Sequence, residues 1–124
     1  MERKFYICEH CGNIITKVKD SKVPVVCCGE KMKEIVAGTT DASLEKHVPI
    51  YKIDKNILIV NVGLVEHPMT EDHFIEFVYI QTNHGEQIKF LKPNQKPCVS
   101  FNLSENEIVE NVFAFCNLHG MWKN

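Results

Sequence analysis

The sequence has no apolar run that approaches the roughly 20 residues a helix needs to cross a bilayer. Its charged first residues, MERKFYICEH, are not followed by the apolar segment that a secretory signal peptide carries. Both absences favour the cytosol as the compartment and predict no membrane partner. Disulfides are rare in that reducing compartment, so cysteines there are expected to be metal ligands, reactive thiols or core residues.

The sequence also has no concentration of charge of one sign. Its 14 Lys and Arg and 16 Asp and Glu are scattered, and the formal net charge is −2. Proteins that bind nucleic acids usually carry a basic patch or stripe. We therefore expect no nucleic acid partner. Internal repeats and low-complexity tracts are absent as well.

Four of the six cysteines fall within about the first 36 residues. A segment of fewer than roughly 40 residues rarely buries enough apolar surface to fold unaided and usually needs a disulfide or a metal. The small and polar stretch AGTTDAS that follows is typical of a linker. The sequence thus predicts a small domain, a linker and a larger domain, at residues 1–36, 37–46 and 47–124.

The larger segment is rich in short β-branched or alternating apolar runs, and no window keeps a helical period of 3.6 residues. We expect its first strand to begin at His47 and its last to end at Cys116. The strand-forming runs lie at 57–64, 73–80, 99–103 and 108–115, with turn signals at 83–85, 92–94 and 96–97. This pattern predicts an all-β protein whose larger domain is an antiparallel β-sandwich of immunoglobulin type.

The cysteines of the small segment form a CxxC pair, CEHCG at 8–12, and an adjacent pair, CCGE at 27–30. Glycine after each pair allows a positive φ, so that backbone N–H groups can point at sulfur. A disulfide between neighbouring residues is strained, which disfavours that alternative. Four thiolates suit tetrahedral iron or zinc, and the spacing does not distinguish them. The four candidate ligands are Cys8, Cys11, Cys27 and Cys28.

A second group of candidate ligands combines four imidazoles with one thiolate. All five are expected at strand ends or in loops, where a rigid scaffold displays functional groups. Structural zinc sites are closed by four ligands, whereas five ligands suit a six-coordinate iron with one open position. A thiolate opposite that position would push electron density through the metal and favour one-electron chemistry on a small molecule. The candidates are His47, His67, His73, His119 and Cys116.

The remaining histidines and the last cysteine have simpler explanations. His84 falls in an Asn-His-Gly turn, and His10 lies inside a knuckle that four thiolates already saturate. We expect both to be solvated side chains. Cys98 stands between Pro97 and a strand and is expected to be an inert core or edge thiol.

These motifs, taken together and in order, resemble the desulfoferrodoxin family, the two-iron superoxide reductases. CEHCG and CCGE resemble its desulforedoxin-type iron site, and EKHVP, HPM with His73, and CNLHG resemble its catalytic iron site. The resemblance covers essentially the whole chain. It implies a rubredoxin- or desulforedoxin-like N-terminal domain beside the sandwich, and two bound iron ions.

The resemblance also implies residue roles. The first iron would be held in a distorted tetrahedron by the four thiolates. The second would be ringed by the four imidazoles in a plane, with Cys116 as the axial ligand. Glu45 and Lys46 would face the open position, the lysine drawing in superoxide and the glutamate ligating the resting ferric ion. The family is typically homodimeric, and small redox proteins such as rubredoxin supply its electrons.

Two other functions remain compatible with the residues alone. One is a non-enzymatic electron carrier, in which the four-cysteine iron is the active part. The other is a zinc-ribbon interaction module fused to a β-sandwich. The first predicts no rapid reaction of the second site with superoxide, and the second predicts a colourless protein.

Overall fold

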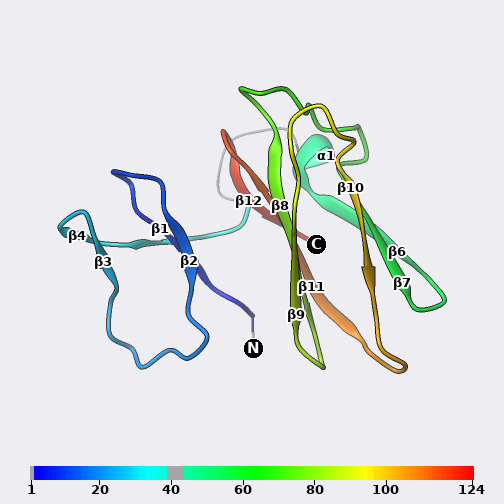
Figure 1. Ribbon diagram of the computed structural model, residues 1–124, viewed down its shortest axis with the longest axis horizontal. Coiled ribbons are helices and arrows are strands. Elements are labelled where there is room, and N and C mark those ends of the chain that lie inside the picture. Colours follow the sequence, from blue (N-terminus) through cyan, green and yellow to red (C-terminus); the bar gives the residue numbers. More distant parts are fainter. Residues whose placement is uncertain (1, 39–43) are drawn as a thin grey trace. The chain divides into compact units, whose positions relative to one another are not determined.

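The computed structural model describes residues 2–38 and 44–124, except for the side chain of Glu45. The chain divides into two compact units, Met1–Val36 and Ala37–Asn124 (Figure 1). Most of the segment expected to be a linker, residues 39–43, lies outside the described residues.

The first unit contains only short strands and has little hydrophobic core. Phe5 and Cys8 are its buried hydrophobic residues within the described part, while Val18, Val23 and Val26 are largely exposed. A three-stranded antiparallel sheet has the order β2-β1-β5, and a hairpin pairs β3 with β4. These strands are β1 (Phe5–Ile7), β2 (Ile14–Thr16), β3 (Val26–Cys27), β4 (Glu30–Lys31) and β5 (Lys33–Ile35). Such a small core agrees with the need for a stabilising metal.

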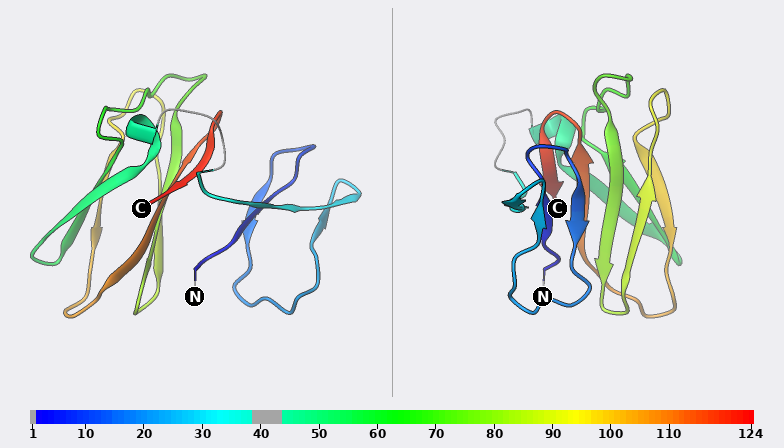
Figure 2. Two further views of the ribbon diagram at one scale, coloured as in Figure 1. Left: turned by 180° about the vertical axis from the view of Figure 1, so that it is seen from behind. Right: turned by 60° about the vertical axis from the view of Figure 1, so that its left-hand side comes forward.

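The second unit is an antiparallel sandwich of two sheets, with orders β10-β7-β6 and β12-β11-β8-β9 (Figures 1 and 2). The all-β class and the sandwich expected from the sequence are therefore confirmed. Its strands are β6 (Pro49–Asp54), β7 (Ile57–Val62), β8 (Ile75–Thr82), β9 (Glu86–Phe90), β10 (Cys98–Asn102), β11 (Val109–Cys116) and β12 (Gly120–Lys123).

The core of the sandwich follows from the two-residue period of its strands. On β7, Leu58, Val60 and Val62 are all buried, and the residues between them are more exposed. Burying each such side chain stabilises the fold by about 1.5–3 kcal/mol. On β11 the buried row ends with Ala114 and Cys116. The thiol of Cys116 is thus fixed by the core at the end of a strand.

Two details differ from the sequence-based expectation. His47 does not begin a strand but ends a one-turn helix, α1 (Leu44–His47), in which the N–H of Val48 donates to the carbonyl of Leu44. Pro49 explains the short length, because the residue before a proline is disfavoured in the α region.

Among the described residues, no helix has the length and apolar character that crossing a membrane requires.

The second difference concerns Cys116, which does not end the last strand. A tight turn and a further strand, β12, follow it. Gly120 has φ +78° where this hairpin closes. The polar and aromatic sequence of β12, GMWK, lacks the alternation that identifies other strands from sequence.

Candidate metal centres

The four cysteines of the first unit lie together. Their sulfur atoms are all within 4.8 Å of one another, and the Sγ atoms of Cys11 and Cys27 are 3.6 Å apart. A tetrahedral ion with metal–sulfur bonds of about 2.3 Å places its sulfurs about 3.8 Å apart. All six cysteines of the chain carry free thiols. The spacing of these four fits a metal site.

The adjacent pair of cysteines is accommodated by an unusual turn. Strands β3 and β4 are joined by the two residues Cys28 and Gly29, whose φ angles are +53° and +79°. Positive φ at both central positions is typical of a type I′ hairpin turn, which asparagine and glycine normally form. A non-glycine residue in this region costs about 1–3 kcal/mol. This strained turn conformation places the Cys28 thiol beside the other three thiols.

Hydrogen bonds that involve the sulfur atoms give these four thiols different pKa values. The backbone N–H of Cys11 lowers the pKa of Cys8 to about 6. Side-chain hydrogen bonds with Cys8, Cys11 and Cys27 raise the pKa of Cys28 to about 12, because they favour its protonated thiol. A cation bound among the four sulfurs would offset the charge of the thiolates and favour their ionised form. This donor set fits a metal ion.

Asn13 offers a way to tune this site, because its Nδ2 donates to Cys27 Sγ at 3.7 Å. We expect Asn13→Ala to lower the reduction potential of an iron held there, since a thiolate that loses a hydrogen bond stabilises the ferric state better. The shift should be on the order of 20–60 mV, from the net worth of one hydrogen bond. A redox titration followed by visible absorption measures it.

The matched control is Asn102→Ala, which removes an exposed asparagine at the end of β10. It should leave the potential of the first site unchanged. An unchanged or higher potential in Asn13→Ala would show that the 3.7 Å contact does not influence the thiolate.

In the second unit, four imidazoles form a square. The centroid distances along its sides are 4.5 Å for His47–His67, 4.7 Å for His67–His73, 5.0 Å for His73–His119 and 4.9 Å for His119–His47. Neighbouring rings are T-shaped, with interplanar angles of 76–86°. The ring centroids of His47 and His73 are 6.3 Å apart, so these two rings stand at opposite corners of the square. A tetrahedral arrangement would give nearly equal separations for all pairs.

The nitrogen atoms of this square are spaced for a common ion. His47 Nε2 is 3.1 Å from both His67 Nε2 and His119 Nδ1. Metal–nitrogen bonds of about 2.1 Å at right angles put adjacent nitrogens about 3.0 Å apart. His73 Nε2 is the one buried side-chain nitrogen or oxygen among the described residues that has no hydrogen-bond partner. A metal ion would satisfy it.

Cys116 contributes a sulfur on one face of the square. Its Sγ is 3.9 Å from His119 Nδ1 and within 4.8 Å of the ligand nitrogens of His47, His67 and His73. An atom that close to all four corners lies over the square, because an atom beside one edge would be farther from the opposite corners. Burial raises the pKa of this thiol, while the backbone N–H groups of Leu118 and His119 oppose that rise.

His67, which is buried, and His73, which is half-buried, are held in the neutral form that binds metal. His67 Nδ1 is 2.6 Å from the carbonyl oxygen of Pro68 and donates to it, which leaves Nε2 as an acceptor. Burial lowers the pKa of His67 to about 4. Burial also lowers the pKa of His73, helped by the nearby charges of His119 and Lys46. Both rings are therefore neutral at pH 7.

Comparison with known proteins agrees with this geometry. The family described as desulfoferrodoxin matches residues 39–124, and its N-terminal domain matches residues 2–35. The chain belongs to the desulfoferrodoxin family. Its two donor sets, one of four cysteines and one of histidines with a cysteine, fit the two iron centres of that family.

Several individual relatives match all or nearly all of the chain. Desulfoferrodoxin from Nitratidesulfovibrio vulgaris is 41% identical over 97% of this chain and 94% of its own length. The desulfoferrodoxin homolog from Archaeoglobus fulgidus is 38% identical over 96% and 94%. The structure of the superoxide reductase from Treponema pallidum matches with a TM-score of 0.84 at 33% identity, covering 100% of this chain and 99% of that one. The 1Fe superoxide reductase from Giardia intestinalis gives 0.55 at 34%, covering 64% and 95%.

The HPM motif has a structural role beyond its histidine. Pro68 supplies the carbonyl that orients His67. Met69 Sδ accepts from the N–H of Ile75 at 3.4 Å, and the Met69 carbonyl accepts from the N–H of Asn94 at 2.7 Å. These bonds fasten the loop between β7 and β8 (residues 63–74, the ligand loop) to the scaffold.

Trp122 contacts two of the candidate ligands, and nothing in the sequence predicts that role. Its ring lies 4.9 Å from the ring of His47 at 30°, and its Nε1 donates to the carbonyl of His119 at 3.0 Å. The side chain is only 1% exposed. It thus restrains both imidazoles.

Gly63 is a second residue whose importance is visible only in the structure. It has φ +89°, and a Cβ there would lie 2.4 Å from the Val65 carbonyl oxygen and 2.6 Å from that of Lys46. We expect Gly63→Ala to displace the peptide between Lys46 and His47 and to weaken iron binding at the second site by about 10-fold or more. Iron content and resistance to a chelator measure this effect.

Gly38→Ala is the matched control. Gly38 also has a positive φ, +73°, but a Cβ there meets nothing within 4 Å. Both variants should lose similar stability through backbone strain. Equal iron retention in the two variants would mean that the contact between Gly63 and Lys46 does not position the site.

The other candidate residues are distributed as follows. Lys46 is exposed on α1 and close enough to His73 to lower its pKa, whereas the side chain of Glu45 is outside the described residues. His10 lies 3.1 Å from Glu30 on the surface of the first unit. His84 lies in the exposed turn between β8 and β9. Among the described residues, neither of these two histidines belongs to a group that could hold a metal.

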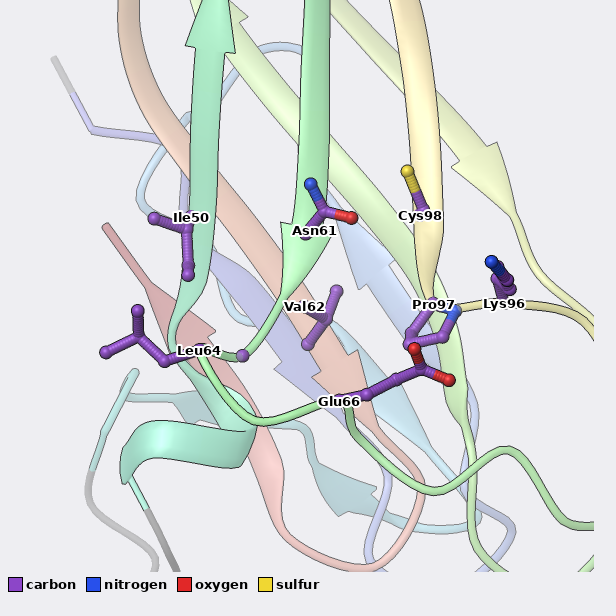
Figure 3. Close-up of a pocket in the computed structure, with 9 residues that line it drawn as sticks. Ile50, Asn61, Val62, Leu64, Glu66, Lys96, Pro97 and Cys98 are labelled. Atoms are coloured by element: carbon purple, nitrogen blue, oxygen red, sulfur yellow. The ribbon is translucent and has the colours of Figure 1, made fainter.

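Cys98 is exposed on the edge strand β10, beside a pocket of about 440 Å³ (Figure 3). Asn61, Glu66 and Lys96 also line this pocket, together with apolar residues of β6 and β7. None of the candidate metal ligands is among its lining residues. The pocket is therefore separate from the chemistry of the imidazole square.

Proposed function

We propose that this protein is a superoxide reductase, which combines superoxide with one electron and two protons to give hydrogen peroxide. The observation that carries the proposal is the square of four imidazoles with one buried thiol on one face. The structural relatives from Treponema pallidum and Giardia intestinalis bear this name. An iron ion in the square would supply the transferred electron.

We assign the metal ligands from the two groups described above. Five protein ligands exceed the four of a closed zinc site and leave one of six positions free. The sulfur lies on one face of the square, so a substrate would approach a bound metal from the other face. The first iron would be bound by Cys8, Cys11, Cys27 and Cys28, and the second by His47, His67, His73, His119 and Cys116.

Lys46 is the residue we assign to attracting superoxide. It is exposed at the edge of the site, and its charge acts on His73. A positive charge beside the site raises the local concentration of an anionic substrate even in a protein whose net charge is −2. Its ammonium group can also donate a hydrogen bond or hold a proton for the departing peroxide.

Glu45 is proposed to face the same open position. It precedes Lys46 in α1, so the same helical turn carries both residues. Its carboxylate would occupy the free position when no substrate is bound, and would be displaced when the site is reduced. Glu45 and Lys46 are the two residues we propose to act on substrate.

The first iron is proposed to stabilise the small unit and to offer a route for electrons. Cys11 and Cys28 are exposed, so an iron bound by them would lie close to the surface. A small redox protein such as rubredoxin is the donor we propose. This exposure is also the observation that favours the second candidate function, a simple electron carrier.

We further propose a homodimer in the cytosol. Edge strand β6 exposes Tyr51 and Ile53, which are 36% and 51% accessible, and such an edge is available for pairing. The six free thiols suit a reducing compartment. Within each chain, residues 1–36 would act as the electron-receiving domain and residues 47–124 as the catalytic domain, joined through 37–46.

Two measurements test the proposed function. They are metal analysis and a visible spectrum of the reduced protein, recorded before and after superoxide is added. We expect two irons per chain and the rapid appearance of the oxidised colour of the second site. An electron carrier would hold two irons but show no rapid change at the second site. A zinc-ribbon module would be colourless and contain zinc.

A further inference from the structure

Asn117 bridges two segments that are far apart in sequence. It begins the turn between β11 and β12 (residues 117–119, the ligand turn). The N–H of Phe74 donates to Asn117 Oδ1 at 3.0 Å, and Asn117 Nδ2 donates to the carbonyl of Asp72 at 3.0 Å. The backbone N–H of Asn117 also donates to the carbonyl of Phe74 at 3.2 Å. The three bonds therefore hold the residues directly before and after His73, Asp72 and Phe74.

The bridge occurs where the backbone ladder becomes irregular. From Asn111 to Phe115, β11 pairs with β8 without a shift in register, but Cys116 then faces Ile75, which marks a bulge. Beyond this bulge the strand pairing no longer fixes the position of the ligand loop against the ligand turn. The side chain of Asn117 provides the next connections between them.

Each side of this bridge carries candidate ligands. The ligand loop supplies His67 and His73, and the ligand turn supplies His119 and adjoins Cys116. Backbone N–H groups of the same turn, from Leu118 and His119, bond to the Cys116 sulfur. A change in the turn would therefore alter both the position of the square's corners and the hydrogen bonds to the thiolate.

We infer that Asn117 is a positioning residue that holds His73 in register with Cys116 and His119 before a metal binds. The inference rests on the ligands assigned under the proposed function. The residue type fits the role, because an asparagine side chain both accepts and donates. Asn117 is exposed, so its hydrogen bonds rather than the burial of its side chain explain its importance.

The test compares Asn117→Ala and Asn117→Asp with Leu118→Ala. Leu118 lies in the same turn with a side chain that is 58% exposed, and alanine there keeps the backbone N–H that bonds to the Cys116 sulfur. Asn117→Asp keeps the size and the acceptor for Phe74 but loses the donor to Asp72. It therefore provides a milder variant if the alanine variant folds poorly.

Three measurements do not involve superoxide. In the metal-free protein, hydrogen exchange of the Phe74 amide should be at least about tenfold faster in Asn117→Ala than in wild type. Iron should leave the second site about 10–100-fold faster in the presence of a chelator, the range found for outer-shell partners of metal ligands. The sulfur-to-iron charge-transfer band of the oxidised protein should move. Asn117→Asp should show smaller changes, and Leu118→Ala should match wild type.

An Asn117→Ala protein with wild-type exchange at Phe74, iron loss and band position would overturn the inference. A lower unfolding temperature with an unchanged band and unchanged iron loss would also overturn it, because Asn117 would then stabilise the fold without positioning ligands. Neither result depends on whether superoxide is the substrate, so the proposed function could fail while this inference stands.

Discussion

Cys116→Ser abolishes the sulfur-to-iron charge-transfer colour of the oxidised second site, on the ligand assignment proposed above. Serine is similar in size but offers a hard oxygen in place of the soft thiolate sulfur. The rate constant with superoxide should fall by at least about 100-fold, since outer-shell partners alone are worth about 10–100-fold. A visible spectrum and rapid-mixing kinetics measure the two effects.

Cys98→Ser is the matched control. Cys98 is an exposed thiol of the same unit, but it does not belong to the group of candidate ligands. Its replacement should leave the colour and the kinetics unchanged. Retained colour in Cys116→Ser would mean that another sulfur is the ligand and that the thiol over the square is not.

Lys46→Ala slows the reaction with superoxide and flattens its dependence on salt. A single charge beside a site attracts an anion strongly at low ionic strength and weakly once the Debye length falls below about 10 Å. We expect a decrease of about tenfold in the second-order rate constant at low salt, with a smaller decrease at high salt. A series of rapid-mixing measurements at increasing ionic strength tests both statements.

Lys55→Asn is a suitable control for the loss of one positive charge. Lys55 lies in the turn between β6 and β7, at the other end of β6 from Pro49 and α1 (Figure 1). It has φ +58°, a conformation that asparagine tolerates. The control should change the rate and its salt dependence little. Unchanged kinetics of Lys46→Ala at every ionic strength would remove Lys46 from the mechanism.

The central strands of the two sheets were those that the sequence predicted best. Residues 57–60 are apolar, and so are residues 108–115 except for Glu110 and Asn111. These runs lie almost entirely within β7 and β11, the central strands of the two sheets. The edge strand β9 and the short β12 were not predicted. Their residues depend on neighbouring strands for burial, so local pattern alone does not identify them.

The candidate ligands were accessible to sequence analysis because ligand chemistry restricts residue type. Cysteine and histidine are uncommon enough that their spacing carries information. The square arrangement of the rings was not accessible from spacing alone and entered only through the resemblance. Gly63, Asn117 and Trp122 were missed, because their roles arise from contacts with residues 17 to 75 positions away, such as Gly63 with Lys46 and Trp122 with His47.

The most direct test of the proposed superoxide reductase activity is the product balance of one reaction between the reduced protein and superoxide without oxygen. We expect one hydrogen peroxide for each superoxide consumed, one oxidised second site, and no release of dioxygen. Release of dioxygen with half as much peroxide would show dismutation instead. Superoxide that decays at the rate seen without protein, leaving the second site reduced, would contradict the account.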